Sequence, residues 1–217
     1  MARPRAKTAR SQSSSRPAAG RFFCRAQSHR SLIQQAAAVH AGVRLPLLPR
    51  RSFAWHSAHV QEQHGELTPE QKQILVDIAE VGVHIVHVQK SAAWPLHSYS
   101  VGLTHSFQQP EVIVFGLPAD AATSLIDSVA DEAGDGRRFE PGSQHDGLLH
   151  NYPVRFATVS SARVAELMPK AAWANGGDVA AVQLVWPDKQ GRWPWQDDVR
   201  EKFAGLQPVL ERFASEV

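Results

Sequence analysis

Apolar residues recur with helical spacing just after residue 66, and this pattern predicts the first ordered element. A helix is predicted over residues 69–81, because Thr68 suits an N-cap, Pro69 the first helical position and Gln71 the third. Apolar residues line one face of this segment until Gly82, the residue type that most often follows the end of a helix. The start and the end of the helix are thus both encoded locally.

Three later segments also have helical spacing of apolar residues. They cover residues 118–134, 162–173 and 197–213. A proline inside a helix removes a hydrogen bond and clashes with the preceding turn. We therefore expect Pro169 to kink or split the second helix, and Pro208 to bend the third.

Shorter runs of apolar and β-branched residues predict strands. They cover residues 83–88, 98–103, 111–117, 152–159 and 179–186, and residues 137–151 are predicted to form a loop with one short turn. Strands that follow one another without an intervening helix favour antiparallel or mixed pairing over regular strand–helix alternation. The expected fold is α+β: a mixed or mostly antiparallel curled sheet, split-barrel-like, with helices packed on it.

The charged residues are unevenly distributed. Eleven of the 23 Lys and Arg residues, and none of the 21 Asp and Glu residues, precede Glu62, so residues 1–61 carry +11 and the remainder −9. The basic segment has no sustained apolar period, so it buries too little surface to offset the entropy cost of ordering. We predict a disordered basic tail over residues 1–61 and a single α+β domain over residues 62–217.

Several interpretations of this tail stay open. Its Arg-rich, acid-poor composition is typical of organelle transit peptides, and a basic arm also binds nucleic acid through counterion release. An inert extension, or a start codon upstream of the natural one, fits as well. If the protein contacts nucleic acid, we expect only the tail to do so.

The single cysteine, Cys24, lies in the tail. The domain therefore has no disulfide, no thiolate metal cluster and no nucleophilic cysteine, which favours the reducing cytoplasm as the location. Residues 31–49 are the most apolar stretch of the tail, but His40, Arg44 and Pro46 interrupt them, so we expect no membrane span.

Two runs, residues 99–117 and 183–195, combine apolar strands with clusters of Gly, Pro, His and Trp. Such a concentration of backbone-special and aromatic residues is typical of a pocket rim. Their hydroxyl, imidazole and indole groups, with a guanidinium from a neighbouring strand, would suit a flavin or another flat anionic ligand. The candidate pocket residues are Tyr99, Thr104, His105, Ser106, Glu111, Arg155, Gln183, Trp186, Asp188 and Trp195.

A structural interpretation of the same residues stays open. Trp186 and Trp195 each adjoin a proline and also suit a hairpin that packs against the core, with Gln183 and Asp188 bonding turn amides. Glu111 is either a catalytic carboxylate or a cap for the backbone at the start of a strand.

Metal and nucleophile motifs are weak or absent in the sequence. His84 and His87 are three residues apart on a predicted strand, so their side chains point to opposite faces and share no metal ion. Residues 102–106 contain Ser and His without the Gly-x-Ser-x-Gly elbow, and the phosphate-loop motifs are missing. We assign no metal site and leave the cofactor unknown, with FMN as the named candidate.

The two runs also resemble a known family. The motifs Tyr-Ser-Val-Gly-Leu, Pro-Glu before a strand closing in Gly-Leu-Pro, Gln-Leu-Val-Trp-Pro-Asp and Gly-x-x-Pro-Trp are similar to the bacterial DUF4262 domain family over residues 74–196. The resemblance implies no activity, because none is assigned to the family. The matching residues are Tyr99, Val101, Gly102, Leu103, Pro110, Glu111, Gly116, Leu117, Pro118, Gln183, Trp186, Pro187, Asp188, Gly191, Pro194 and Trp195.

A shorter similarity links residues 100–117 to the strand–loop–strand segment of split-barrel flavin reductases, and by analogy it implies a flavin site. Three hypotheses for function follow. The first is a module that binds an unknown small molecule or a partner, the second a flavin-dependent oxidoreductase of split-barrel type, and the third a hydrolase using His105 or His145. We rank the binding module first, because nothing in the sequence demands turnover.

Overall fold

Six strands form one open sheet in the order β1–β2–β3–β6–β5–β4. The computed structural model describes residues 66–211 of the chain. Neighbouring strands are antiparallel except for the parallel pair β3 and β6, so the α+β class and the mixed sheet are confirmed. The sheet is not closed into a barrel, and its split-barrel-like curl stays a prediction.

The strands are β1 (His84–Val88), β2 (His97–Val101), β3 (Glu111–Phe115), β4 (Gln144–Leu149), β5 (Tyr152–Val159) and β6 (Ala181–Val185). The helices are α2 (Pro69–Val81), α3 (Leu103–Phe107), α4 (Ala119–Gly134), α5 (Ser161–Leu167), α6 (Pro169–Ala174) and α7 (Glu201–Ala204). The predicted tail over residues 1–61 lies outside the described residues, so the proposed domain boundary stays a prediction.

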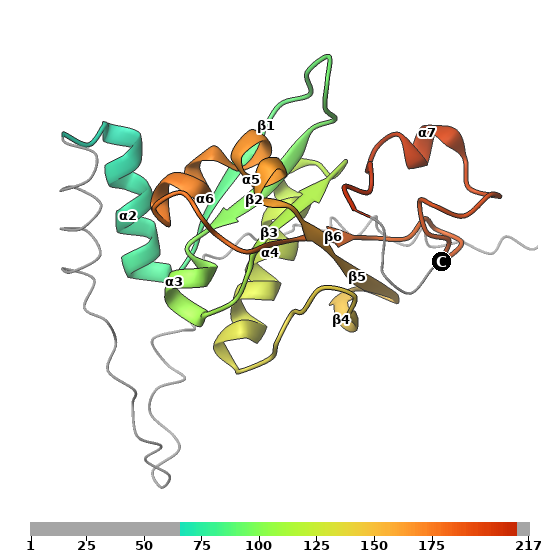
Figure 1. Cartoon of the computed structure of the whole chain (residues 1–217). Coiled ribbons are helices and arrows are strands. Elements are labelled where there is room, and N and C mark those ends of the chain that lie inside the picture. Colours follow the sequence, from blue (N-terminus) through green and yellow to red (C-terminus); the bar gives the residue numbers. More distant parts are fainter. Residues whose placement is uncertain (1–65, 212–217) are drawn as a thin grey trace, which may run out of the picture. The chain divides into compact units, whose positions relative to one another are not determined.

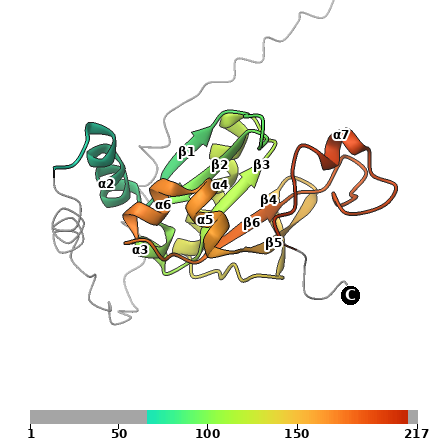
Figure 2. The same cartoon turned by 45° about the horizontal axis from the view of Figure 1, so that its top comes forward.

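Helices cover both faces of the sheet (Figures 1 and 2). Consecutive strand residues point to opposite faces. Val112 and Val114 of β3 therefore join a core cluster with α4, whereas Ile113 and Phe115 join a second cluster with α2, α5 and α6. Every residue of β2, β3 and β6 is buried, as expected for central strands covered on both faces.

The helix boundaries follow the local signals in the sequence. Thr68 and Gln71 form the predicted capping box, with the Gln71 N–H donating to Thr68 Oγ1 over 3.2 Å and the Thr68 N–H donating to Gln71 Oε1 over 2.8 Å. Gly82 ends α2 in the left-handed conformation. Pro169 splits the predicted helix over residues 162–173 into α5 and α6. No helix within residues 66–211 is long and apolar enough to cross a bilayer.

Strand β4 lies in the part of the chain that the sequence predicts to be a loop, so this prediction is wrong. Only Leu148 of this edge strand is buried. The register with β5 shifts between His145 and Leu149, which breaks the alternation that marks a strand in sequence. An edge strand with one buried residue leaves almost no hydrophobic pattern to detect.

Helix α3 replaces the predicted end of the second strand and the loop after it. Gly102 turns the chain with φ +118°, a conformation that other residues rarely adopt, and the helix begins at the next residue. The reason is not in the local sequence, because the group that holds the turn is Glu111, on the following strand.

The long terminal helix predicted over residues 197–213 is also wrong. Of its described residues, 197–211, only the four of α7 are helical. The chain then continues as an irregular segment, residues 205–210, which we call the C-terminal strap. Leu206 and Gln207 belong to this strap, and the Gln207 side chain is fully buried against the end of β6.

Candidate functional site

The predicted pocket residues fall into two groups at opposite ends of the sheet. Glu111 pairs with Ala181, the first residue of β6, whereas Arg155 pairs with Val185, its last residue. Because each strand residue advances the chain by about 3.3 Å, roughly 13 Å of strand separates these two levels. α3 and α7, which mark the two ends, lie far apart in both views (Figures 1 and 2). One pocket lined by all the predicted residues is not formed.

The first group is organised by the carboxylate of Glu111, which is completely buried. It accepts a hydrogen bond from Ser100 Oγ over 2.6 Å and from the backbone N–H groups of Gly102, Leu103 and Thr104 over 2.9, 3.3 and 3.2 Å. A carboxylate at the beginning of a helix satisfies N–H groups that have no partner within the helix. Glu111 therefore acts as a cap, supplied by β3 to α3, which is the structural one of its two predicted roles.

His105 and Ser106 lie on α3, next to this cap. Burial lowers the pKa of His105 below its ordinary value, although the nearby Glu111 carboxylate opposes the shift. Ser106 is exposed, and its N–H donates to the carbonyl of Gly102 within the helix turn. Thr104 uses its hydroxyl to bond the carbonyl of Gln109 over 3.0 Å. This group places an imidazole of lowered pKa beside a fully hydrogen-bonded carboxylate.

Tyr99 and Trp186, two predicted pocket residues, contribute to the core instead. Tyr99 is 1% exposed, and burial raises the pKa of its hydroxyl to about 12. The Trp186 indole N–H donates to the carbonyl of Phe115 over 3.0 Å, and its ring meets Phe203 edge-on at 5.0 Å between centroids. Both rings are held by internal contacts that a ligand would have to replace.

Gln183 holds the C-terminal strap. Its side-chain amide donates to the carbonyl of Pro208 over 2.9 Å and accepts from the N–H of Leu210 over 2.8 Å. Gln183 has no exposed surface, so its amide must find internal partners. Gln183 therefore does not face a pocket but connects β6 to the C-terminal strap.

The second group brings Arg155 and Trp195 together, with Trp193 as a third member; we call these three residues the Arg–Trp cluster. The two indole planes are 6° from parallel, with centroids 5.3 Å apart. The guanidinium carbon of Arg155 lies 5.4 Å from the Trp195 ring centroid and 5.8 Å from that of Trp193. The rings pack against buried Ala157 and Val185, and all three members of the cluster stay partly exposed. This arrangement combines flat apolar faces with a planar cation.

Asp188 fixes the loop that carries the two tryptophans. Its carboxylate accepts from the backbone N–H groups of Gln190 and Arg192, each over 2.9 Å, and from Arg192 Nε and Nη2 over 2.9 and 2.7 Å. Hydrogen bonding from the Arg192 side chain is the main reason that the pKa of Asp188 is lowered. Arg192 Nη1 also donates to the carbonyl of Asp198 over 2.8 Å, so the Arg192 side chain joins both ends of the loop.

Trp193 was missing from the predicted site. The sequence around it reads Trp193-Pro194-Trp195, and the fixed φ of a proline favours extended chain. In extended chain, residues i and i+2 point to the same side, which was the signal available for pairing the two rings. Arg192 and Gln207 were missed as well, because their partners lie across loops whose folding the sequence does not reveal.

His145, a candidate base for hydrolysis, contacts a serine. Its Nε2 lies 2.9 Å from Ser143 Oγ, and burial is the largest cause of its lowered pKa. The Ser143 hydroxyl, however, donates its one hydrogen to the carbonyl of Glu140 over 2.6 Å. The imidazole then donates to the hydroxyl oxygen, which is the reverse of what a general base does. This geometry does not favour the hydrolase hypothesis.

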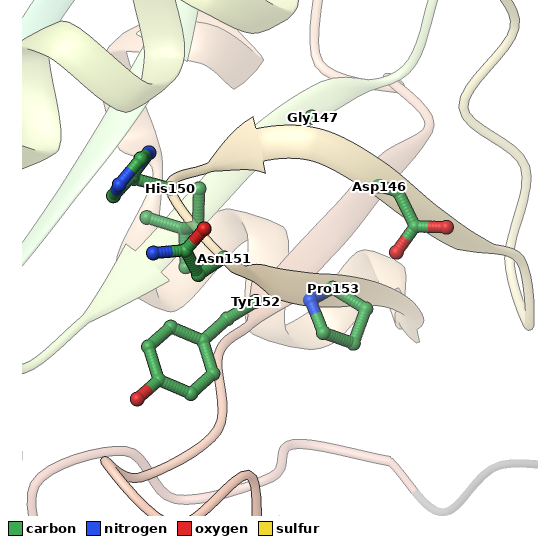
Figure 3. A pocket seen from close by; sticks show the side chains of 7 residues that line it. Asp146, Gly147, His150, Asn151, Tyr152 and Pro153 are labelled. Carbon is green, nitrogen blue, oxygen red and sulfur yellow. The ribbon is translucent and has the colours of Figure 1, made fainter.

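A separate cavity of about 270 Å³ lies along the hairpin of β4 and β5 and is lined by Asp146, Gly147 and residues 149–153 (Figure 3). None of the predicted pocket residues lines it. Within residues 66–211, no group of three or more His, Cys, Asp and Glu side chains is placed to hold a metal ion.

Comparison with known proteins gives a family. The family model described as a domain of unknown function, DUF4262, matches residues 77–200, which include the two runs 99–117 and 183–195. Neither the curated proteins nor the solved structures contain a match to the chain.

Proposed function

The chain belongs to the DUF4262 family, a domain of unknown function, and we propose that this domain is a binding module that takes up a planar, anionic small molecule at the Arg–Trp cluster. The observation that carries the proposal is the position of the Arg155 guanidinium, 5.4 and 5.8 Å from the centroids of two parallel indole rings that stay partly exposed. A planar ligand stacks on indole, and an anionic substituent bonds to guanidinium.

The stacking energy is large enough to matter. An aromatic pair contributes about 0.5–1.5 kcal/mol beyond the burial of its area. Arg155 adds directional recognition, because a guanidinium presents two parallel N–H groups to a carboxylate or phosphate, which an ammonium group does not. Arg and Trp are also enriched among the residues that contribute most to binding at protein–protein interfaces.

Hydrogen bonds fix the loop that carries Trp193 and Trp195, and this order favours ligand binding at the two rings. Asp188 receives four hydrogen bonds from the loop between the strand and the rings. Gln196 Oε1 accepts from the Trp193 N–H over 2.7 Å and fixes the chain next to the first ring. A surface that is already ordered loses little conformational entropy when a ligand binds.

FMN is a suitable first probe, because it is planar and anionic and corresponds to the flavin alternative. Riboflavin is the matched probe without the phosphate. In titrations of the full chain, we expect FMN to bind more tightly than riboflavin, and Trp195→Ala to weaken FMN binding about fivefold or more through the loss of stacking. Arg155→Lys should reduce the preference for FMN over riboflavin, since the lysine cannot form a bidentate contact.

A second Trp–Arg pair in the domain supplies the control. Arg163 lies 4.9 Å from the Trp94 ring centroid, and Trp94 also donates to Glu166 over 2.8 Å. Trp94→Ala removes a comparable pair elsewhere and should leave FMN affinity unchanged. If FMN does not bind at about 100 µM, the flavin alternative fails. If AMP, a second planar anion, does not bind either, the proposal itself fails.

We keep the reducing cytoplasm as the proposed location, because Cys24 is the single cysteine of the chain. Contact with nucleic acid is proposed only for residues 1–61, which carry +11. Chemical turnover is not part of the proposal.

A further inference from the structure

The hairpin of β4 and β5 is shaped into a concave surface by two irregularities. The register between the strands shifts between His145 and Leu149, and Gly147 within this stretch has φ +94°. Leu149 pairs with Tyr152, so the chain reverses over two residues, and the second of these, Asn151, has φ +65°. Bulges of this kind bend a strand and redirect its side chains. The cavity of about 270 Å³ lies along this bent hairpin.

The cavity brings several hydrogen-bonding groups to one place. Asp146 supplies a carboxylate, Asn151 a carboxamide and His150 an imidazole, and Pro153 and Tyr152 supply ring surfaces. Figure 3 shows Asp146 and Pro153 toward one end of the hairpin and His150, Asn151 and Tyr152 toward the turn. A ligand that contacts both ends must therefore offer polar groups on opposite sides of a small ring.

Tyr152 is fixed in position by a contact outside the cavity. Its hydroxyl donates to the carbonyl of Lys189 over 2.8 Å, so the ring is the surface that it offers to a ligand. Asp146 uses its backbone carbonyl to accept from Arg137 Nη2 over 3.1 Å. Within residues 66–211, its carboxylate forms no ion pair. The negative charge of Asp146 is thus available to a ligand.

We propose that this hairpin cavity binds a monosaccharide-sized polyol that carries an amine. The volume of about 270 Å³ is just below the usual range of small-molecule sites, about 300–1,000 Å³, and matches one sugar ring better than a nucleotide. Carboxylate and carboxamide groups form hydrogen bonds with vicinal hydroxyls, and the carboxylate attracts an ammonium group. The rings of Tyr152 and Pro153 cover the C–H face of a sugar. This site is separate from the Arg–Trp cluster and selects the opposite charge.

The test is an amide NMR titration of the full chain with D-glucosamine, with D-glucose and D-glucuronate as comparison probes. We expect the amide signals of Gly147, Leu149 and Asn151 to shift, with affinity decreasing from glucosamine to glucose to glucuronate. Asp146→Asn should weaken glucosamine binding roughly fivefold, as one charge-assisted hydrogen bond is lost. It should also remove the discrimination against glucuronate.

Two further variants separate the site from the fold. Asn151→Gly keeps the left-handed turn, because glycine adopts it freely, and removes the carboxamide, so binding should weaken while the spectrum stays folded. Glu140→Gln removes an exposed charge outside the cavity lining and should leave affinity unchanged. The proposal is overturned if none of the three sugars shifts the hairpin amides at about 50 mM. It is also overturned if Asp146→Asn binds glucosamine as well as the native chain does.

Discussion

The side-chain amide of Gln207 bonds both polar groups of the Trp186 backbone, donating to its carbonyl over 2.6 Å and accepting from its N–H over 3.2 Å. Gln183 makes the converse pair of bonds with the backbone of Pro208 and Leu210. In each case a primary amide replaces the peptide group that a neighbouring strand would present. The C-terminal strap is thus attached to β6 without forming a seventh strand.

Removal of the Gln207 amide should destabilise the domain. In Gln207→Met, the Trp186 N–H and carbonyl lose their partner in a part-buried environment, which costs about 1–3 kcal/mol. Urea denaturation of the full chain measures the change in the free energy of unfolding. Gln190→Met, at an exposed position on the loop that carries Trp193 and Trp195, is the matched control. It should change the free energy of unfolding by less than about 0.5 kcal/mol. If Gln207→Met and Gln190→Met unfold at the same urea concentration, the hydrogen bonds of Gln207 do not stabilise the domain.

Gly116 lies where the backbone of the C-terminal strap closely approaches the end of β3. A Cβ at this position would lie 2.8 Å from the carbonyl oxygen of Leu206, and the residue has φ +75°. Gly116→Ala therefore meets both a backbone clash and an unfavourable conformation. Gly136 has φ +93° with nothing within 4 Å of its Cβ position, so Gly136→Ala isolates the conformational cost. We expect Gly136→Ala to cost about 1 kcal/mol and Gly116→Ala clearly more, both measured by thermal unfolding.

The stability of the domain should fall as the pH is lowered through the histidine range. Burial lowers the pKa of both His105 and His145 below the ordinary value of 6.5. Between the lowered folded value and 6.5, the unfolded chain binds more protons than the folded chain, so stability rises with pH in this interval. The contribution is complete above 6.5 and is lost progressively below it.

Glutamine substitutions assign this pH dependence to the two imidazoles. His105→Gln and His145→Gln should each make the decrease in unfolding free energy below pH 6.5 smaller, and the double variant should reduce it further. Chemical denaturation at a series of pH values gives the slope directly. An unchanged slope in the double variant would show that burial of these rings is not its cause.

The sequence predicts the fold where the deciding interactions are local. The capping box of Thr68 and Gln71 and the helix break at Pro169 depend on neighbours within a few residues, and both are confirmed. Helix α3 and the strap depend on Glu111 and Gln183, whose partners lie on other elements. The periodicity of the final segment is helical, but the distant Gln183 amide bonds its backbone in another conformation, and its own Gln207 amide bonds the backbone of Trp186.

The predicted site shows the same division between local and distant information. Residue type alone indicates Arg155 and Trp195, which meet, and Glu111, which caps a helix. Residue type does not show that these residues lie at opposite ends of β3 and β6. The strand register that separates them is set by pairings across the sheet, which no local pattern specifies.

Trp186 and Trp195, two of the three tryptophans in residues 183–195, should respond differently to truncation, and this contrast tests the assignment of roles. Trp186 donates to Phe115 and packs against the α4 side of the core, so Trp186→Ala should lower the free energy of unfolding by about 3–5 kcal/mol. Trp195 packs against the small cluster of Ala157 and Val185, outside the large core cluster that Trp186 contacts, so Trp195→Ala should cost less stability and more FMN affinity. Melting temperature and FMN titration on the same two proteins measure both effects. A large stability loss at Trp195 with unchanged affinity per folded molecule would mean that the Arg–Trp cluster only packs the loop against β5 and β6, and the proposed binding role would fail.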